Sequence, residues 1–393
     1  MSTLRVLAVG LSVVVVGSIP GFLPGSLAPR IGGDLHFGSA ELGIVVAAFY
    51  AASAVASGPA GNLVERIGAS AGMRLTCAVA AATMFAVAVL GRSTGALVVV
   101  VGLSGVGNAL ATPGSAALVA AGLRERWRGL GYGTAQGGAS WAALLAGLAL
   151  PGIAIPLGWR WAFVATGLLA IVVGLTVPGG VKRPVSEVAP APAGSTSARP
   201  GPARLGLARL GFAAYLLAAA AALAAAATIS MVSFLVLYAL RVGLDERQAG
   251  LLLALVGIAG AVGRSGFGLL AGQRGGARAL VWASLLLCAG SAGFLLLATG
   301  SPGALVLGAL LAGGVGASWS GLGTVAATSA APGRPAAAVG VMMTGLFTGA
   351  VGGPLAVGLI SGHAGYRLVW VANAGLILAA AGVLHLVRRI AFS

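Results

Sequence analysis

The chain alternates long apolar runs with short polar breaks. A helix needs about 20 apolar residues to cross the hydrocarbon core of a bilayer, and twelve runs have about that length. The predicted spans are 6–28, 41–61, 74–91, 95–121, 130–152, 161–179, 211–240, 248–271, 279–299, 303–327, 336–360 and 367–387. Strands of a membrane barrel alternate apolar and polar positions over about ten residues, whereas these runs are apolar on every side. The pattern therefore predicts an all-α membrane protein with twelve transmembrane helices.

One long polar segment divides the spans into two sets of six. Residues 181–210 are rich in proline, serine and basic residues, and such a segment buries too little apolar surface to fold alone. We therefore expect three parts, namely an N-terminal six-helix bundle at 1–180, an aqueous linker at 181–210 and a C-terminal six-helix bundle at 211–393.

An internal repeat relates the two sets of spans. Residues 158–160 read Gly-Trp-Arg and residues 365–367 read Gly-Tyr-Arg, an offset of 207, and the same offset connects Gly43 with Gly250. Because six spans return the chain to its starting side, both bundles enter the membrane in the same orientation. We expect them to be related by a pseudo-twofold axis along the membrane normal.

Composition supports a membrane protein and excludes several other classes. Hydrophobic residues make up 59% of the chain and charged residues 8%, whereas a soluble domain has about 25% charged residues. A soluble enzyme and a secreted disulfide scaffold are therefore excluded. The net charge of +16 is spread between apolar runs rather than clustered on one face, as DNA binding requires. We expect a lipid bilayer, and no nucleic acid, as a partner.

Basic residues also predict the orientation of the chain. With the N-terminus inside, sixteen of the 23 basic residues lie on the inner side, six lie on the outer side, and Arg264 lies within a span. Basic residues accumulate in cytoplasmic loops, so we expect the linker and both termini in the cytoplasm. The abundance of Ala, Gly and Arg is typical of a GC-rich bacterial genome, which predicts a multi-pass protein of the bacterial inner (plasma) membrane.

The common sets of catalytic residues are missing from the sequence. Its one lysine, Lys182, is followed by Arg183, so the chain has no phosphate-binding loop of the Gly-x4-Gly-Lys-Ser/Thr type. The three histidines, His36, His363 and His385, do not have the spacing of a helical zinc site. We therefore expect no cofactor and no metal, and a membrane-embedded enzyme is a less favoured alternative.

The loop after the second span carries a recognisable motif. Residues 61–68 read Gly-Asn-Leu-Val-Glu-Arg-Ile-Gly. With the twelve spans and the six-plus-six repeat, this loop resembles that of the major facilitator superfamily, which runs Gly-x-x-x-Asp-Arg-x-Gly. Gly61, Arg66 and Gly68 match, and Glu65 replaces the usual Asp. The resemblance implies the family's fold and a gating role for this loop in holding the outward-open state. The alternative is that Arg66 only anchors the inner membrane surface.

Arg264 is the only charged residue in the interior of a predicted span, because Glu41, Arg74 and Arg367 stand at the first position of theirs. At 1.5 Å rise per residue it lies about 6 Å from the middle of its helix, toward the cytoplasmic side. An ionisable residue at this depth is a candidate functional residue, and it could pair with an anionic substrate. The other interpretation is that its long side chain reaches the cytoplasmic surface as an anchor.

Polar and aromatic residues within the spans suggest a substrate cavity. Asn108 and Gln136 are costly to bury without partners, and Trp319 lies between two serines on the tenth span. With Arg264, the aromatic residues Tyr50 and Phe347 complete the candidate set. The alternative is that these polar residues only bond helix to helix, which is common in membrane bundles.

Together these features predict a secondary active or facilitative transporter of a small molecule that works by alternating access. Efflux and transport of an organic anion or metabolite both remain open, and a channel-like pore without alternating access is the alternative. Because no acidic residue lies mid-span, a coupling proton could use only Asp34, Glu41 or Glu65. A coupling ion is therefore left open. We expect the chain to act as a monomer.

Overall fold

A computed structural model describes residues 3–123, 131, 133–179, 203–272, 276–330 and 335–391. Throughout these ranges the regular secondary structure is helical and contains no strand. Twelve helices there are long and apolar enough to cross a membrane. The all-α architecture predicted from the apolar runs is therefore confirmed.

The first six spans form the N-terminal half. They are α1 (Thr3–Leu35), α2 (Ser39–Ile67), α3 (Ala69–Leu90), α4 (Thr94–Gly122), a fifth span that includes α6 (Gly138–Ala149), a π-helical segment η1 (Leu150–Ala154) and α7 (Ile155–Leu157), and finally α8 (Trp159–Thr176). Residues 124–130 and 132, before the fifth span, lie outside the described residues.

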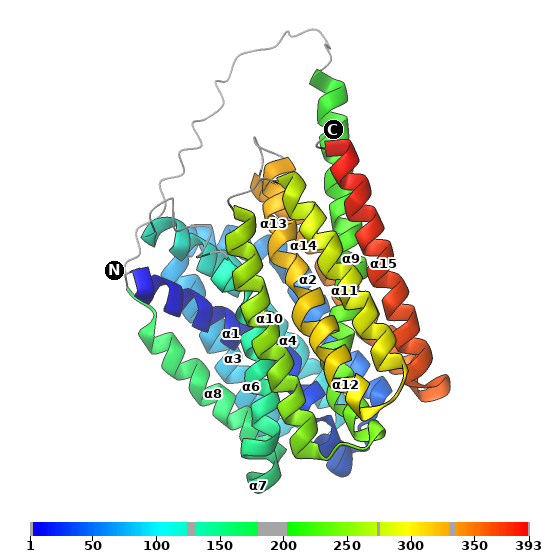
Figure 1. The fold of residues 1–393 in the computed structure, drawn as a ribbon. Helices are drawn as coiled ribbons and strands as arrows, with labels where there is room; N and C mark the ends of the chain where they lie inside the picture. The colour runs from blue at the N-terminus through cyan, green and yellow to red at the C-terminus, as the bar shows by residue number, and fades with distance from the viewer. Residues whose placement is uncertain are drawn as a thin grey trace.

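The second six spans form the C-terminal half. They are α9 (Ala203–Val242), α10 (Glu246–Gly272), α11 (Gly276–Ala298), a tenth span made of α12 (Pro302–Ala309), η2 (Leu310–Val315), η3 (Gly316–Ser318) and α13 (Trp319–Ala330), then α14 (Pro335–His363) and α15 (Gly365–Ala391). Helix α9 begins within the range predicted as linker, although its apolar part begins only at Phe212. The rest of that range, up to residue 202, lies outside the described residues. Figure 1 shows the first turns of α9 extending beyond the other helices, with the end of α15 beside the part of α9 that follows.

The same local chemistry starts the fourth and tenth spans. The Ser93 side chain accepts a hydrogen bond from the backbone N–H of Ala96, and the Ser301 side chain accepts one from Ala304. A serine at this position satisfies one of the N–H groups that a helix start leaves without a partner. The two caps are 208 positions apart, so the internal repeat extends to the signals that begin the helices.

Among the glycines that bring the two halves into backbone contact, two are related by the internal repeat. Helix α2 packs against α14, and α10 packs against α6. A Cβ atom on Gly43 of α2 would lie 2.6 Å from the carbonyl oxygen of Pro354, and one on Gly250 of α10 would lie 2.8 Å from that of Gly147. Gly43 and Gly250 are 207 positions apart, and so are Gly147 and Pro354. The two contacts are therefore counterparts, as a pseudo-twofold axis between the halves requires.

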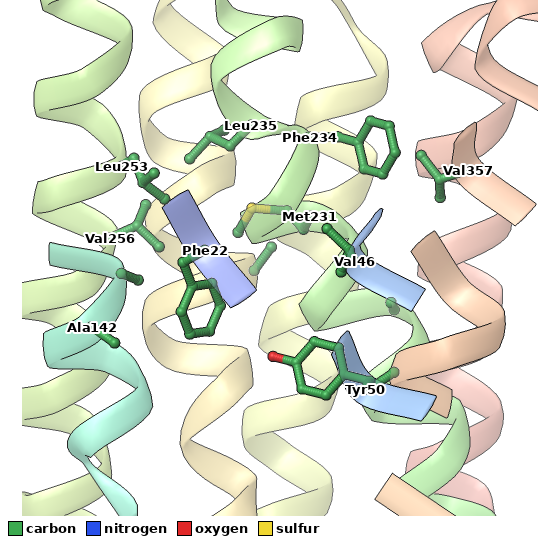
Figure 2. Close-up of a cluster of buried hydrophobic side chains, with 14 of the residues drawn as sticks. Phe22, Val46, Tyr50, Ala142, Met231, Phe234, Leu235, Leu253, Val256 and Val357 are labelled. Atoms are coloured by element: carbon green, nitrogen blue, oxygen red, sulfur yellow. The ribbon is translucent and has the colours of Figure 1, made fainter. Parts of the chain in front are cut away.

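The hydrophobic core is continuous across the junction of the halves. Figure 2 shows Phe22 from α1 and Val46 from α2 beside Met231 from α9, with Val256 from α10 close by. Each of these four side chains is buried. Lipid supplies no hydrophobic drive for helices to associate, so close packing of this kind holds membrane bundles together.

Candidate functional site

The two ends of the bundle differ in the contacts they make. We call the external end the one at which α1 finishes and α2, α8, α10 and α15 begin, because the charge pattern predicts that it faces outward; the opposite end is the internal end. At the external end, the Asp34 carboxylate accepts hydrogen bonds from the Trp159 indole at 2.9 Å and from Arg160 at 3.0 Å. These bonds tie the end of α1 to the start of α8.

The second half has an equivalent contact between its first and last spans, but with a positive charge in place of the negative one. Position 34 corresponds to Arg241 and position 159 to Tyr366, each 207 residues later. The guanidinium carbon of Arg241 lies 5.1 Å from the centre of the Tyr366 ring, which is a favourable cation–π distance. The repeat therefore keeps the contact between the first and last spans of each half but exchanges a carboxylate for a guanidinium.

Polar contacts join the two halves at the external end. The Arg30 Nε atom of α1 lies 2.7 Å from a carboxylate oxygen of Glu246 on α10. The hydroxyl groups of Ser39 on α2 and Tyr366 on α15 are 3.3 Å apart and share a hydrogen bond. With the glycine contacts of Gly43 and Gly250, these interactions close the external end of the junction.

Further toward the internal end, the two interfaces between the halves become unlike. The rings of Tyr50 on α2 and Phe347 on α14 have centroids 6.5 Å apart. Their counterparts by the 207-residue offset are Gly257 and Ser140, and a Cβ on Gly257 would lie 2.7 Å from the Ser140 carbonyl oxygen. An aromatic pair therefore separates α2 from α14, whereas α10 and α6 are in backbone contact at the equivalent level.

Arg264 lies beside this junction, on α10. Its Nε atom donates a hydrogen bond to the Ser320 hydroxyl of α13 at 3.2 Å. One terminal nitrogen lies 3.5 Å from the position that a Cβ on Gly260 would take, next to the Ser140 hydroxyl, and the guanidinium is within electrostatic range of Tyr50. Within the described part of the chain it forms no ion pair. The site is thus a fixed positive charge without a carboxylate partner.

The tenth span departs from regular α-helix just before Ser320, the hydrogen-bond partner of Arg264. Segment η2 is π-helical and η3 is a turn of 3-10 helix, and such departures within a helix often occur at functional sites. The Ser318 hydroxyl donates to the Gly314 carbonyl at 2.8 Å and satisfies part of the irregular backbone. Ser320 lies two residues after Ser318, so the irregular segment is close to the charge of Arg264.

The other predicted cavity residues lie in different surroundings. Trp319 is 3% exposed and packs over Gly323 of its own helix. The Asn108 amide accepts from Ser18 at 3.3 Å and donates to Ser53 at 3.1 Å, which joins α4 to α1 and α2 within one half. Gln136 is partly buried on the fifth span. Contact of these three with a substrate stays a prediction.

The predicted gating loop lies at the internal end. Glu65 and Arg66 are exposed in the last turn of α2. Gly68 ends that helix with φ +89°, a conformation that favours glycine, and its N–H donates to the Val64 carbonyl at 2.8 Å. Nothing would meet a Cβ on Gly61 within 4 Å. The role of this loop in the outward-open state stays a prediction, and the side chains of its counterpart at 268–275 lie outside the described part.

Sequence reasoning missed two grooves beside this loop. One, of about 660 Å³, is lined by Ala56, Pro59, Ala60, Asn62, Leu63, Arg66, Leu75, Val79, Val106 and Leu110. The other, of about 710 Å³, lies across α3 and is lined by Ile67, Gly68, Ser70, Ala71, Arg74, Leu75, Ala78 and Gly179. Both are mainly apolar and distant from Arg264 along the chain. Sequence reasoning also missed the pair of Arg30 and Glu246, which lie 216 positions apart.

The twelve spans in two like-oriented halves, with the charged side chain of Arg264 beside their junction, define a polytopic membrane transporter. The chain belongs to the Major Facilitator Superfamily, whose sequence profile matches residues 9–334. This confirms the family and the fold that the loop motif and the repeat predicted.

Solved structures show the same fold. A bacterial homologue of the human lysosomal transporter Spinster, in an inward-facing and occupied conformation, matches with a TM-score of 0.70 and 18% identity over 98% of this chain and 96% of that chain. Its inward-facing and unoccupied form matches with a TM-score of 0.74 and 18% identity over 100% and 98%. At this identity the likeness concerns the fold alone. No curated protein matches the sequence.

Proposed function

We propose that this protein is a secondary active or facilitative transporter that moves a small molecule by alternating access, in efflux or in uptake. Its two halves rock against each other and open a shared path to one side at a time. One observation carries the proposal. The hydrogen bonds that the described residues make between the halves, Arg30 with Glu246 and Ser39 with Tyr366, lie at the external end, while Glu65 is exposed at the internal end.

The proposal includes the placement of the chain. The protein lies in the inner membrane with both termini and the segment 181–210 in the cytoplasm, because its basic residues favour that side. The functional units are the bundles at 1–180 and 211–393. One chain contains both halves, so a monomer suffices for transport.

The acidic residues favour facilitated or anion-linked transport over proton coupling. Asp34 is engaged by Trp159 and Arg160, and a Glu41 carboxylate oxygen accepts the N–H of Gly38 at 2.8 Å. Glu65, the third candidate, is exposed at the end of its helix. A proton carrier needs an acid that changes surroundings between the two states, and in the described spans Asp34 and Glu41 are already held at the external end.

Cross-linking the external end distinguishes alternating access from a channel. Arg30→Cys with Glu246→Cys, joined by a bifunctional thiol reagent, holds the two halves together there, in a background in which the exposed Cys288 is replaced by serine. A compound that stabilises the purified protein in a thermal-shift screen of metabolites, organic acids and drugs serves as the transported species. We expect cross-linking to stop its flux and cleavage of the linker to restore it. Unchanged flux after complete cross-linking supports a pore without alternating access.

A further inference from the structure

Arg264 carries a charge within a membrane bundle, and no carboxylate of the described residues balances it. Removing a charged group from water is costly unless it is paired or hydrogen-bonded, and within the described chain its hydrogen-bond partner is the neutral Ser320 hydroxyl. The guanidinium has five N–H donors, and the bond to Ser320 uses the Nε atom. Among the described residues neither terminal nitrogen has a hydrogen-bond partner, so both can bind an anion.

A second donor lies on the opposite half. Tyr50 of α2 is in electrostatic range of Arg264, and no hydrogen-bond partner of its hydroxyl occurs among the described residues. Figure 2 shows this hydroxyl turned toward the middle of the bundle, below Phe22. A carboxylate accepts hydrogen bonds from a guanidinium fork and a phenol at once. A ligand there would contact both halves.

Beyond these two groups and the hydroxyls of Ser140 and Ser320, the surroundings are mainly apolar. The Tyr50 ring meets Phe49 with centroids 5.0 Å apart and Phe347 at 6.5 Å, and Val46, Met231 and Val256 pack in the same cluster. One positive charge in such surroundings balances one negative charge. A second charge on the ligand, or a body covered with hydroxyl groups, would be buried without partners.

We propose that the transported molecule is a monoanion with an apolar, preferably aromatic, body. Its carboxylate binds the guanidinium of Arg264 and the hydroxyl of Tyr50, and its body lies against the rings of Tyr50 and Phe347. Because Arg264 belongs to the C-terminal half and Tyr50 to the N-terminal half, the bound anion connects the halves that must move. This inference rests on the proposed transport function and names the class of its cargo.

Direct binding to purified protein tests the inference, with titration calorimetry as the readout. The probes are benzoate, benzamide as its neutral isostere, acetate without a ring, phthalate as a dianion and benzylammonium as a cation. We expect benzoate to bind saturably. Each of the other four should bind at least about tenfold more weakly, because it lacks the charge-assisted hydrogen bonds or the ring contacts. Benzamide or benzylammonium bound as tightly as benzoate would overturn the proposal.

Variants assign the binding to these residues. Arg264→Gln should weaken the binding of benzoate about tenfold or more. The affinity of Arg264→Lys should lie between those of the wild type and Arg264→Gln, because lysine keeps the charge but lacks the two parallel N–H donors of the guanidinium. Tyr50→Phe should weaken benzoate several-fold and keep its preference over acetate, whereas Phe347→Ala should reduce that preference. Arg278→Gln, at an exposed arginine of the same half, should bind benzoate like the wild type.

The result also separates the cargo from the transport mechanism. Unchanged benzoate affinity in Arg264→Gln means that the arginine is a structural anchor, and the proposal fails. If Arg264→Gln does not fold, binding of the five probes to the wild type and to Tyr50→Phe still tests whether the site prefers an aromatic monoanion. Cross-linking of the external end tests alternating access without reference to benzoate, so a wrong cargo leaves that test intact.

Discussion

Gly43 and Gly250 stand 207 positions apart and meet equivalent backbone on the opposite half, Pro354 and Gly147. Neither has room for a side chain, because the nearest carbonyl oxygen would be 2.6 or 2.8 Å from a Cβ atom. The two glycines therefore let the external end close symmetrically. Transport by alternating access requires that this closure be reversible, so it should be sensitive to small changes in volume.

Gly43→Val should open the external end. Overpacking costs about 1–3 kcal/mol, which shifts the ratio of closed to open forms by roughly five- to hundredfold. A cysteine at Phe22, in the buried core below that end, should then react faster with a membrane-impermeant maleimide. Gly33→Ala is the matched control, since nothing lies within 4 Å of a Cβ there. Equal labelling of both variants would contradict the closing role of Gly43.

The pair of Arg30 and Glu246 should contribute modestly to the same closure. Its side chains are 40% and 31% exposed, and partly exposed ion pairs contribute about 0.2–1 kcal/mol. Arg30→Glu and Glu246→Arg should each favour the open external end, and the double variant should recover much of the loss. A double-mutant cycle on maleimide labelling measures this coupling. Strictly additive effects would mean that the pair does not hold the halves together.

Glu65 should affect transport without affecting the arrangement described here. The loop motif predicts that its charge stabilises the outward-open state, while in this structure the side chain is exposed. Glu65→Gln should slow transport about tenfold or less, since only one contact is lost, and leave the thermal stability unchanged. Glu65→Asp, which keeps the carboxylate, should transport at close to the wild-type rate. Equal loss in both variants would point to folding rather than gating.

Asp34 should stabilise the N-terminal half rather than take part in transport. Its carboxylate bonds Trp159 and Arg160 at an exposed surface. Asp34→Ala should lower the melting temperature, whereas Asp34→Asn should lower it less, because the amide oxygen can still accept from Trp159. The transport rate per folded molecule should stay constant in both. A steep loss of transport with unchanged stability would instead assign proton coupling to Asp34.

The sequence predicted those parts of the fold that depend on local pattern. Apolar runs of sufficient length located the spans, and the offset between residues 158–160 and 365–367 revealed the repeat. Glycine positions alone did not show which of them meet the opposite half. That depends on how far two helices approach, a tertiary property that no local pattern encodes, as Gly43 and Gly61 illustrate.

The sequence predicted several residues of the candidate site but not the contacts that they make. Arg264 stood out because a charge within a span is rare, and Tyr50 and Phe347 were expected from their positions. Ser320 as the partner of Arg264, and the irregular winding before it, depend on side-chain geometry. Asn108 was expected to line the cavity, but it bonds Ser18 and Ser53. These partners lie 90 and 55 positions away in the sequence, so no local pattern could show them.

The most direct test of alternating access is a pair of distance measurements by electron–electron double resonance. Spin labels at Arg92 and Thr299 report on the external end, and labels at Asn62 and Arg278 on the internal end, each pair connecting exposed positions of the two halves. The wild type should show a short external and a long internal distance. In Gly43→Val the external distance should lengthen while the internal one shortens. Distances that change together, or an internal distance unaffected by an opened external end, would contradict rocking of the two halves.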